Sequence, residues 1–306
     1  MQIISAPSIL GLKPTGVEKL PESLLSNGLF ESLGCQKSIV NVPTQNSTYS
    51  LNRDKNSCLN TEGIRLFSGD LAKELSPVLK QKDFALVLGG DCSILIGICS
   101  ALKANGTYGL LFYDAHADFY QPEKSVTGEL ADMDLAIVTG RGPDILTDIN
   151  HLKPYVADDH VIHIGQRDWE ETKKYGSQDI RETAVRCFDY EAIKKAGIQP
   201  SLKAIEQQIN TLNVDGFWIH FDTDVLSDNE NPAVDYRLPG GFTFDEGEQI
   251  LKGLLSTNKI VGMSVTIFNP KLDDEQGSIA KKLTRLLSRC LKNLCYPVPY
   301  LLCLCG

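Results

Sequence analysis

The sequence predicts an α/β protein with a mostly parallel central sheet that is covered by helices on both faces. Short apolar runs rich in β-branched residues alternate with amphipathic helical patterns along the chain, which is typical of βαβ units. Hydrophobic residues make up 42% and charged residues 23% of the 306 residues, so the chain has the composition of an ordinary globular protein. No low-complexity linker and no repeat of fixed period divides it.

Eight apolar runs have the length and composition of strands. They cover residues 3–4, 38–42, 84–88, 108–113, 161–164, 216–221, 260–268 and 300–305. Strands buried on both faces of a parallel sheet are nearly continuous in their hydrophobicity, as these are. We therefore expect a sheet of about eight strands.

Amphipathic helical patterns fill the intervals between the runs. They cover residues 71–81, 93–104, 190–196, 201–212, 243–256 and 278–294. Three loops, at 46–62, 121–134 and 227–241, are longer than most connections in compact folds. Two of these loops directly follow acidic strand ends, so we expect them to recognise the substrate.

Charge and hydropathy exclude several classes of partner. The net charge of −9 argues against a nucleic-acid-binding surface, which would be basic. No run of about 18 apolar residues predicts a membrane span, and residues 1–7 lack the basic start of a signal peptide. Nine scattered cysteines, an odd number, favour reduced thiols over a disulfide framework. These features predict a cytoplasmic protein that acts on small molecules.

Two segments, 110–118 and 217–224, place acidic and imidazole side chains on alternate residues directly after an apolar run. The residues concerned are Asp114, His116, Asp118, His220, Asp222 and Asp224. Residues two apart on an extended chain share one face, and the carboxyl ends of parallel strands are where ligands bind. Several buried carboxylates need a compensating cation. The pattern predicts a site for two divalent ions, whereas the alternative is that each aspartate only caps the following turn.

A third segment, Gly89-Gly90-Asp91-Cys92-Ser93, follows the run at 84–88 and starts a helix pattern. Paired glycines permit a tight strand-to-helix turn. Together the three segments resemble the ureohydrolase superfamily of arginase, agmatinase and formimidoylglutamase, whose pattern is GGDHS, DAHxD and a DxD strand end. Ile164 to Asp168 and Phe268 to Pro270 extend this resemblance over nearly the whole chain.

The resemblance implies a three-layer α/β/α arginase-like fold formed by residues 1–306 as a single domain. It also implies assembly into homo-oligomers, as trimers or hexamers. Carried over by position, it makes Asp114 and Asp222 the carboxylates that contact both ions. The remaining ligands are Cys92 and Asp118 for one ion, and His116 and Asp224 for the other. Oxygen-rich coordination suits two Mn²⁺ ions, and in the family a metal-bridging hydroxide attacks the guanidinium carbon.

Cys92 is the main departure from the family pattern, because it stands where the family has a histidine ligand. A thiolate at this position would allow Zn²⁺ or Fe²⁺ as well as Mn²⁺. Alternatively Cys92 remains a thiol and leaves the ion weakly held, or it is simply a small buried residue at a helix start.

Two further departures concern the substrate and proton transfer. The proton-shuttling histidine of arginase-like members is absent from the segment 128–134, where Ala131 stands, and the acidic residue that holds the guanidinium is absent from 266–268. Glu129, Asp132 and Asp134 offer a different set of anions for a cationic substrate, or form a solvated acidic loop. His220 is a candidate general acid, or alternatively a histidine of the core.

The sequence thus favours a metal-dependent hydrolase of a linear C–N bond in a guanidino or amidino compound. One alternative is a catalytically silent family member that binds or regulates, having lost tight metal binding at Cys92. Another is an amidohydrolase that resembles the related deacetylases. The substrate itself and the identity of the metals do not follow from the sequence.

Overall fold

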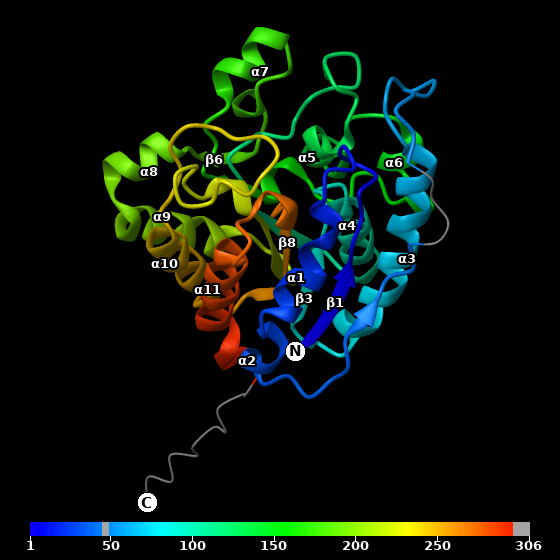
Figure 1. Cartoon of the computed structure of the whole chain (residues 1–306). Coiled ribbons are helices and arrows are strands. Elements are labelled where there is room, and N and C mark those ends of the chain that lie inside the picture. The colour runs from blue at the N-terminus through cyan, green and yellow to red at the C-terminus, as the bar shows by residue number, and fades with distance from the viewer. Residues whose placement is uncertain (45–48, 296–306) are drawn as a thin grey trace, which may run out of the picture.

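Eight parallel strands form one sheet in the computed structural model, which describes residues 1–44 and 49–295 (Figure 1). The order of the strands is β2-β1-β3-β8-β7-β4-β5-β6. Their bounds are β1 Gln2–Ala6, β2 Val40–Asn41, β3 Ala85–Gly89, β4 Tyr108–Tyr113, β5 Val161–Ile164, β6 Arg186–Phe188, β7 Gly216–Asp222 and β8 Ile260–Thr266. The predicted sheet of about eight mostly parallel strands is confirmed.

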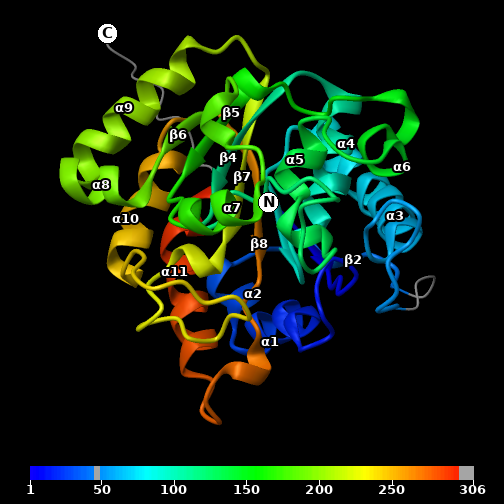
Figure 2. The same cartoon turned by 90° about the horizontal axis from the view of Figure 1, so that it is seen from above.

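Helices cover both faces of this sheet (Figures 1 and 2). Their bounds are α1 Leu20–Ser26, α2 Leu29–Leu33, α3 Thr61–Lys80, α4 Ile94–Asn105, α5 Asp134–Val138, α6 Asp144–Thr147, α7 Trp169–Tyr175, α8 Tyr190–Ala196, α9 Ile198–Thr211, α10 Phe244–Leu255 and α11 Ser278–Cys295. None of these described helices is long and apolar enough to cross a membrane.

The strands divide their side chains between two hydrophobic cores, because successive residues of a strand point to opposite faces. Phe112 of β4 and Trp218 of β7 pack with α3, α4, α5 and α6 on one face. Tyr113 and Phe217, one residue away in each strand, pack with α1, α2, α8, α9, α10 and α11 on the other. The structure therefore has the three-layer α/β/α arrangement that the sequence predicted.

One strand differs from those predicted. The eighth strand of the sheet is β6, which the apolar pattern missed because Arg186–Phe188 is short, only partly buried and lies at the sheet edge. The predicted strand at 300–305 lies outside the described residues. The predicted helix at 71–81 begins ten residues earlier, at Thr61, and ends at Lys80.

The turn after β3 depends on Gly90, because the chain passes very close to the segment that follows β1. A Cβ atom at position 90 would lie 1.8 Å from the carbonyl oxygen of Ser8. We expect Gly90→Ala to lower the free energy of unfolding by about 3 kcal/mol, since backbone atoms must move to relieve the clash. Thermal unfolding measures this. The matched control is Gly69→Ala in α3, where the added methyl meets nothing within 4 Å and should be neutral or stabilising; equal effects of the two variants would contradict the prediction.

Candidate metal centre

The four central strands β3, β8, β7 and β4 bring the predicted ligand segments together at their carboxyl ends. Cys92 lies in the turn between β3 and α4. Asp114 directly follows β4, and Asp222 is the last residue of β7. The parallel register pairs Phe221 with Tyr113, so that Asp222 and Asp114 emerge side by side from neighbouring strands. Because these strands are parallel and lie side by side, the three segments share one edge of the sheet.

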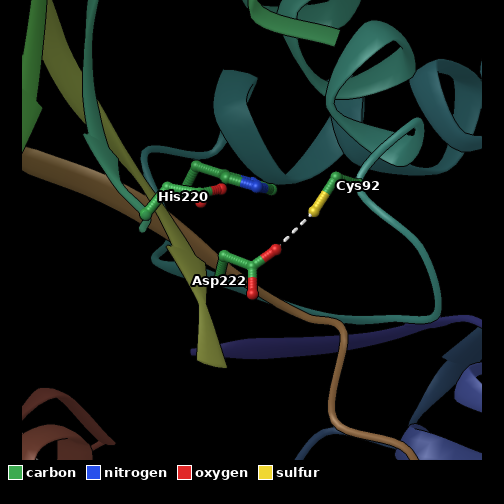
Figure 3. Close-up of side chains that lie close together, drawn as sticks. Cys92, His220 and Asp222 are labelled. Atoms are coloured by element: carbon green, nitrogen blue, oxygen red, sulfur yellow. Dashed lines mark hydrogen bonds between the residues drawn. The ribbon is translucent and has the colours of Figure 1, made fainter. Parts of the chain in front are cut away.

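A first group of possible metal ligands consists of Cys92, Asp114, His220 and Asp222, whose ligand atoms all lie within 4.8 Å of one another. All four side chains are buried, with at most 2% of each residue exposed. The Cys92 thiol donates a hydrogen bond to Asp222 Oδ2 over 2.8 Å (Figure 3) and lies 3.2 Å from Thr266 Oγ1. Asp114 Oδ2 is buried without a hydrogen-bond partner among the described residues.

A second group consists of Asp114, His116 and Asp224. His116 Nδ1 lies 3.0 Å from Asp224 Oδ2 and 3.7 Å from Asp114 Oδ1. The backbone fixes these carboxylates, because the amide of His116 donates to Asp114 Oδ1 over 2.7 Å and that of Asp224 donates to Asp222 Oδ1 over 2.9 Å. Asp114 belongs to both groups, which is the position that a bridging carboxylate requires.

Asp118 lies outside both groups, although it is buried and lines the same cavity. Its backbone has a φ of 45°, in the left-handed region that aspartate tolerates better than most residues. Its neighbour Asp134 is also buried, which raises the pKa of that carboxyl, and neither carboxylate oxygen of Asp134 has a hydrogen-bond partner among the described residues. The structure therefore brings five of the six predicted metal ligands into the two groups and adds His220 to the first.

The site gathers several buried carboxylates with one imidazole beside them. Burial raises the pKa of Asp114 to about 7 and holds those of Asp118 and Asp222 well above the ordinary value. Burial also acts to raise the pKa of Asp224, but the adjacent His116 outweighs it and lowers that pKa. A single imidazole cannot compensate four buried carboxylates. Divalent cations bound by these oxygens would compensate the negative charge. The donor set therefore fits a metal pair.

His220 and His163 flank the ring of Phe112 on neighbouring strands, and both imidazoles are fully buried. Burial lowers the pKa of His220 to about 3 and that of His163 to about 4, so both rings are neutral near neutral pH. His163 Nε2 contacts the carbonyl oxygen of His116 at 2.7 Å. Alternate spacing already placed His220 on the same face as Asp222. The resemblance gave His220 no metal, however, so sequence reasoning considered it a general acid or a core residue.

An acidic cavity of about 450 Å³ leads to the two groups. Two predicted recognition loops line it, through Thr127, Glu129 and Asp132 from one and through Tyr236 and Leu238 from the other. The described lining contains eight carboxylates, and its one arginine, Arg237, is paired with Asp228 at the surface. The described part of the third loop does not line the cavity; Arg53 instead supports the loop at 121–134 by donating to the carbonyl oxygen of Ser125 over 3.1 Å.

The stability of the protein is expected to depend on pH through Asp132, which lies in the wall of this cavity. Burial raises its pKa from 3.8 to about 7, while Ser125 and Thr127 donate hydrogen bonds to Oδ2. Because the folded state favours the protonated form, its contribution to stability is complete below about pH 4 and is lost as the pH rises through 7. We expect Asp132→Asn to gain stability relative to the wild type between pH 4 and pH 8, by up to about 4 kcal/mol. Unfolding at each pH measures this, and a difference independent of pH would refute it.

Comparison with known proteins identifies the family to which the chain belongs. A family model described as "Arginase family" matches residues 3–291 of the chain. The chain belongs to the arginase family. The predicted membership in the ureohydrolase superfamily is thus confirmed.

The arginase of Staphylococcus aureus (strain COL) is 31% identical over 282 residues, which are 89% of this chain and 91% of that protein. The native crystal structure of the arginase from Bacillus caldovelox superposes with a TM-score of 0.85 at 26% identity and covers 95% of this chain and 97% of the other. Formimidoylglutamase from Bacillus subtilis shares the fold, with a TM-score of 0.73 at 17% identity. This arginase-family chain is accordingly a hydrolase of a linear C–N bond, as the sequence predicted.

Proposed function

We propose that the protein hydrolyses the linear C–N bond of a cationic guanidino or amidino compound, using two divalent ions held at the carboxyl ends of β4 and β7. The observation that carries this proposal is the pair of ligand groups that share Asp114. Two groups with one carboxylate in common, at the end of an acidic cavity, suit a reaction in which two cations act on one substrate.

The proposed ligands of one ion are His116, Asp114, Asp222 and Asp224. These groups supply mainly carboxylate oxygen, which suits Mn²⁺. The other ion is assigned to Asp114, Asp222 and Cys92. We retain Asp118 as a proposed ligand of this ion because it lines the same cavity. When bound, such a metal pair lowers the pKa of a water molecule and so supplies a nucleophile at neutral pH.

The protein's own residues bind and orient the substrate. The cavity walls are acidic where they continue away from the ligands, which favours a positively charged substrate. Glu129 is 2% exposed and accepts a hydrogen bond from Tyr236 at Oε2 over 2.7 Å. Its Oε1 atom is buried without a partner among the described residues, and we propose that a donor on the bound substrate supplies the missing hydrogen bond.

His220 does not line the cavity, so we do not propose it as the general acid. Ala131 lines the cavity but carries no group that transfers a proton. The side chains of the described lining that exchange protons are therefore the carboxyl groups, His116 and the tyrosine hydroxyls. We infer that one of these or solvent replaces the histidine that arginase-like members use.

The decisive experiment is metal analysis combined with a substrate panel. Protein purified without chelator is expected to carry close to two divalent ions per chain, and to release urea, ammonia or a related amide from at least one guanidino, formimino or amidino compound. Release of acetate from acetylated amines instead would favour a deacetylase-like reaction. Less than a tenth of an ion per chain, with no activity after addition of Mn²⁺, would leave a silent binding protein.

Glu129 gives a specific test of substrate charge. Glu129→Gln keeps the shape of the side chain and an acceptor for Tyr236 but removes the negative charge. Since a charge-assisted hydrogen bond is worth about 1.4 kcal/mol or more, we expect KM for the cationic substrate to rise about tenfold, with a smaller change in kcat. Steady-state kinetics measure both. Glu123→Gln, an exposed residue of the same loop, is the control, and an unchanged KM in Glu129→Gln would argue against the contact.

We also propose that the chain forms a single domain, acts in the cytoplasm and assembles as a homo-oligomer. The match of the family over residues 3–291 supports the first point. Trimers or hexamers are expected from the resemblance to the ureohydrolases. Light scattering on the purified protein distinguishes a monomer from either assembly.

A further inference from the structure

His220 is held in one orientation by a stacking contact on one face of its ring and by a polar contact at its edge. It stacks on Phe112 with ring centroids 4.9 Å apart and an interplanar angle of 18°. Its Nδ1 atom lies 3.0 Å from Ser264 Oγ on the neighbouring strand β8. The other ring nitrogen, Nε2, has only a distant contact, at 3.5 Å from Thr266 Oγ1. The ring extends toward Cys92 and Asp222 in Figure 3.

Ser264 can also determine which ring nitrogen of His220 carries the proton. Trp218 Nε1 donates to Ser264 Oγ over 3.1 Å. A hydroxyl oxygen can accept two hydrogen bonds, so Ser264 can accept from both Trp218 and the Nδ1–H group of His220. In that tautomer the lone pair of Nε2 is free. A histidine that binds a metal is oriented in this way, by a hydrogen bond from its other nitrogen.

We propose that His220 is a ligand of the first ion and that it supplies the imidazole which is missing at position 92. The inference rests on the proposed two-metal function. Cys92, Asp114, His220 and Asp222 then form a set of one sulfur, one nitrogen and two carboxylates, with all ligand atoms within 4.8 Å of one another. The imidazole comes from the interior of β7 instead of from the turn after β3.

This ligand set changes the metal that the site prefers. Cysteine sulfur and imidazole among the ligands of a buried site suit Zn²⁺, whereas the second group, with two carboxylates and His116, suits Mn²⁺. The two sites of the pair should therefore differ in selectivity. We expect Zn²⁺ to occupy the first site ahead of Mn²⁺ when both are supplied together.

Cobalt and zinc binding to the full chain test the assignment without measuring activity. Apoprotein titrated with Co²⁺ should show the near-ultraviolet absorption of a thiolate-to-cobalt charge transfer, and Cys92→Ala should lose this absorption. His220→Gln should keep the sulfur contact but weaken cobalt binding at the first site by about 100-fold. His163→Gln, which removes the other buried imidazole beside Phe112, and Cys99→Ala, which removes another buried thiol, are the matched controls and should leave the absorption unchanged.

X-ray absorption of the wild-type protein loaded with zinc provides a measurement that needs no variant. It should show one sulfur at about 2.3 Å and two imidazoles for each pair of ions, from His116 and His220. One imidazole per pair, or cobalt affinity that is unchanged in a folded His220→Gln variant, would overturn the assignment of His220. If the sulfur is absent but two ions are bound, Cys92 is not a ligand and the proposed function still stands. If no metal is bound, both the proposed function and the assignment of His220 are wrong.

Discussion

Replacing Asp222 by asparagine is expected to lower kcat/KM by on the order of 10³, equivalent to about 4 kcal/mol, and to reduce the bound metal from two ions to one or none. Asp222 lies in the first ligand group, and its Oδ1 also accepts the amide hydrogen of Asp224 in the second group. The amide of asparagine has nearly the same shape but cannot neutralise a cation, so the proposed ions lose both charge compensation and a shared ligand. Steady-state kinetics and metal analysis measure these two effects.

The matched control is Asp179→Asn, which removes an aspartate charge from an exposed ion pair with Arg181. An exposed pair contributes little to stability, so this variant should retain both metal and activity. An Asp222→Asn protein that is folded, holds two ions and turns over at the wild-type rate would contradict the assignment of Asp222 as a ligand.

Removing the metal is expected to destabilise the protein strongly. A ligand at 1,000 times its dissociation constant stabilises the folded state by about 4 kcal/mol per site, which corresponds to a change in Tm of roughly 10 °C for a chain of this size. The physical reason is that chelation leaves Asp114, Asp222 and Asp224 buried together without cations. Differential scanning calorimetry with and without a chelator measures the change.

Acid should weaken this stabilisation, because carboxylate and imidazole ligands must lose their protons to bind a metal. The difference in Tm between metal-loaded and chelated protein should therefore shrink as the pH falls through about 7, since burial raises the pKa of Asp114 in the metal-free protein to about 7. Metal-loaded Asp222→Asn should show little difference at any pH. A wild-type protein whose Tm does not respond to chelator would indicate that the buried carboxylates are compensated by protonation alone.

Local patterns were sufficient to predict most elements, and long-range packing explains the failures. Helix α8 lies at residues 190–196 as predicted, because its amphipathic pattern is bounded by Asp189 and Gly197. Strand β6 was missed since its few residues are partly buried and gain their structure from pairing with β5. The order of the strands could not be predicted, as it depends on β8 inserting between β3 and β7.

In the metal centre, too, local spacing predicted some features and long-range packing determined the others. Alternate spacing correctly placed Asp114 near His116 and Asp222 near Asp224, although of these residues only Asp222 lies within a strand: Asp114 and His116 follow β4, and Asp224 lies in a short 3₁₀ turn. The placement of Asp118 near Asp134 and outside both ligand groups was not predictable, since it depends on the left-handed backbone at Asp118 and on how the following loop folds back. Likewise the burial of His220 beside Cys92 depends on β3 and β7 lying on either side of β8.

The insertion of β8 into the middle of the sheet has a consequence for how the protein matures. Cys92 and Asp222 are 130 residues apart in sequence, and Cys92 and Thr266 are 174 apart. Contacts of such long range form late in folding, because the loop that they close is large. A nascent chain that has left the ribosome only as far as β7 still lacks β8. This strand lies between β3 and β7 and so aligns the turn that contains Cys92 with the strand end that contains Asp222. Metal loading should therefore be a post-translational event, and the competition between metals would be decided by the ions present in the cell after synthesis is complete.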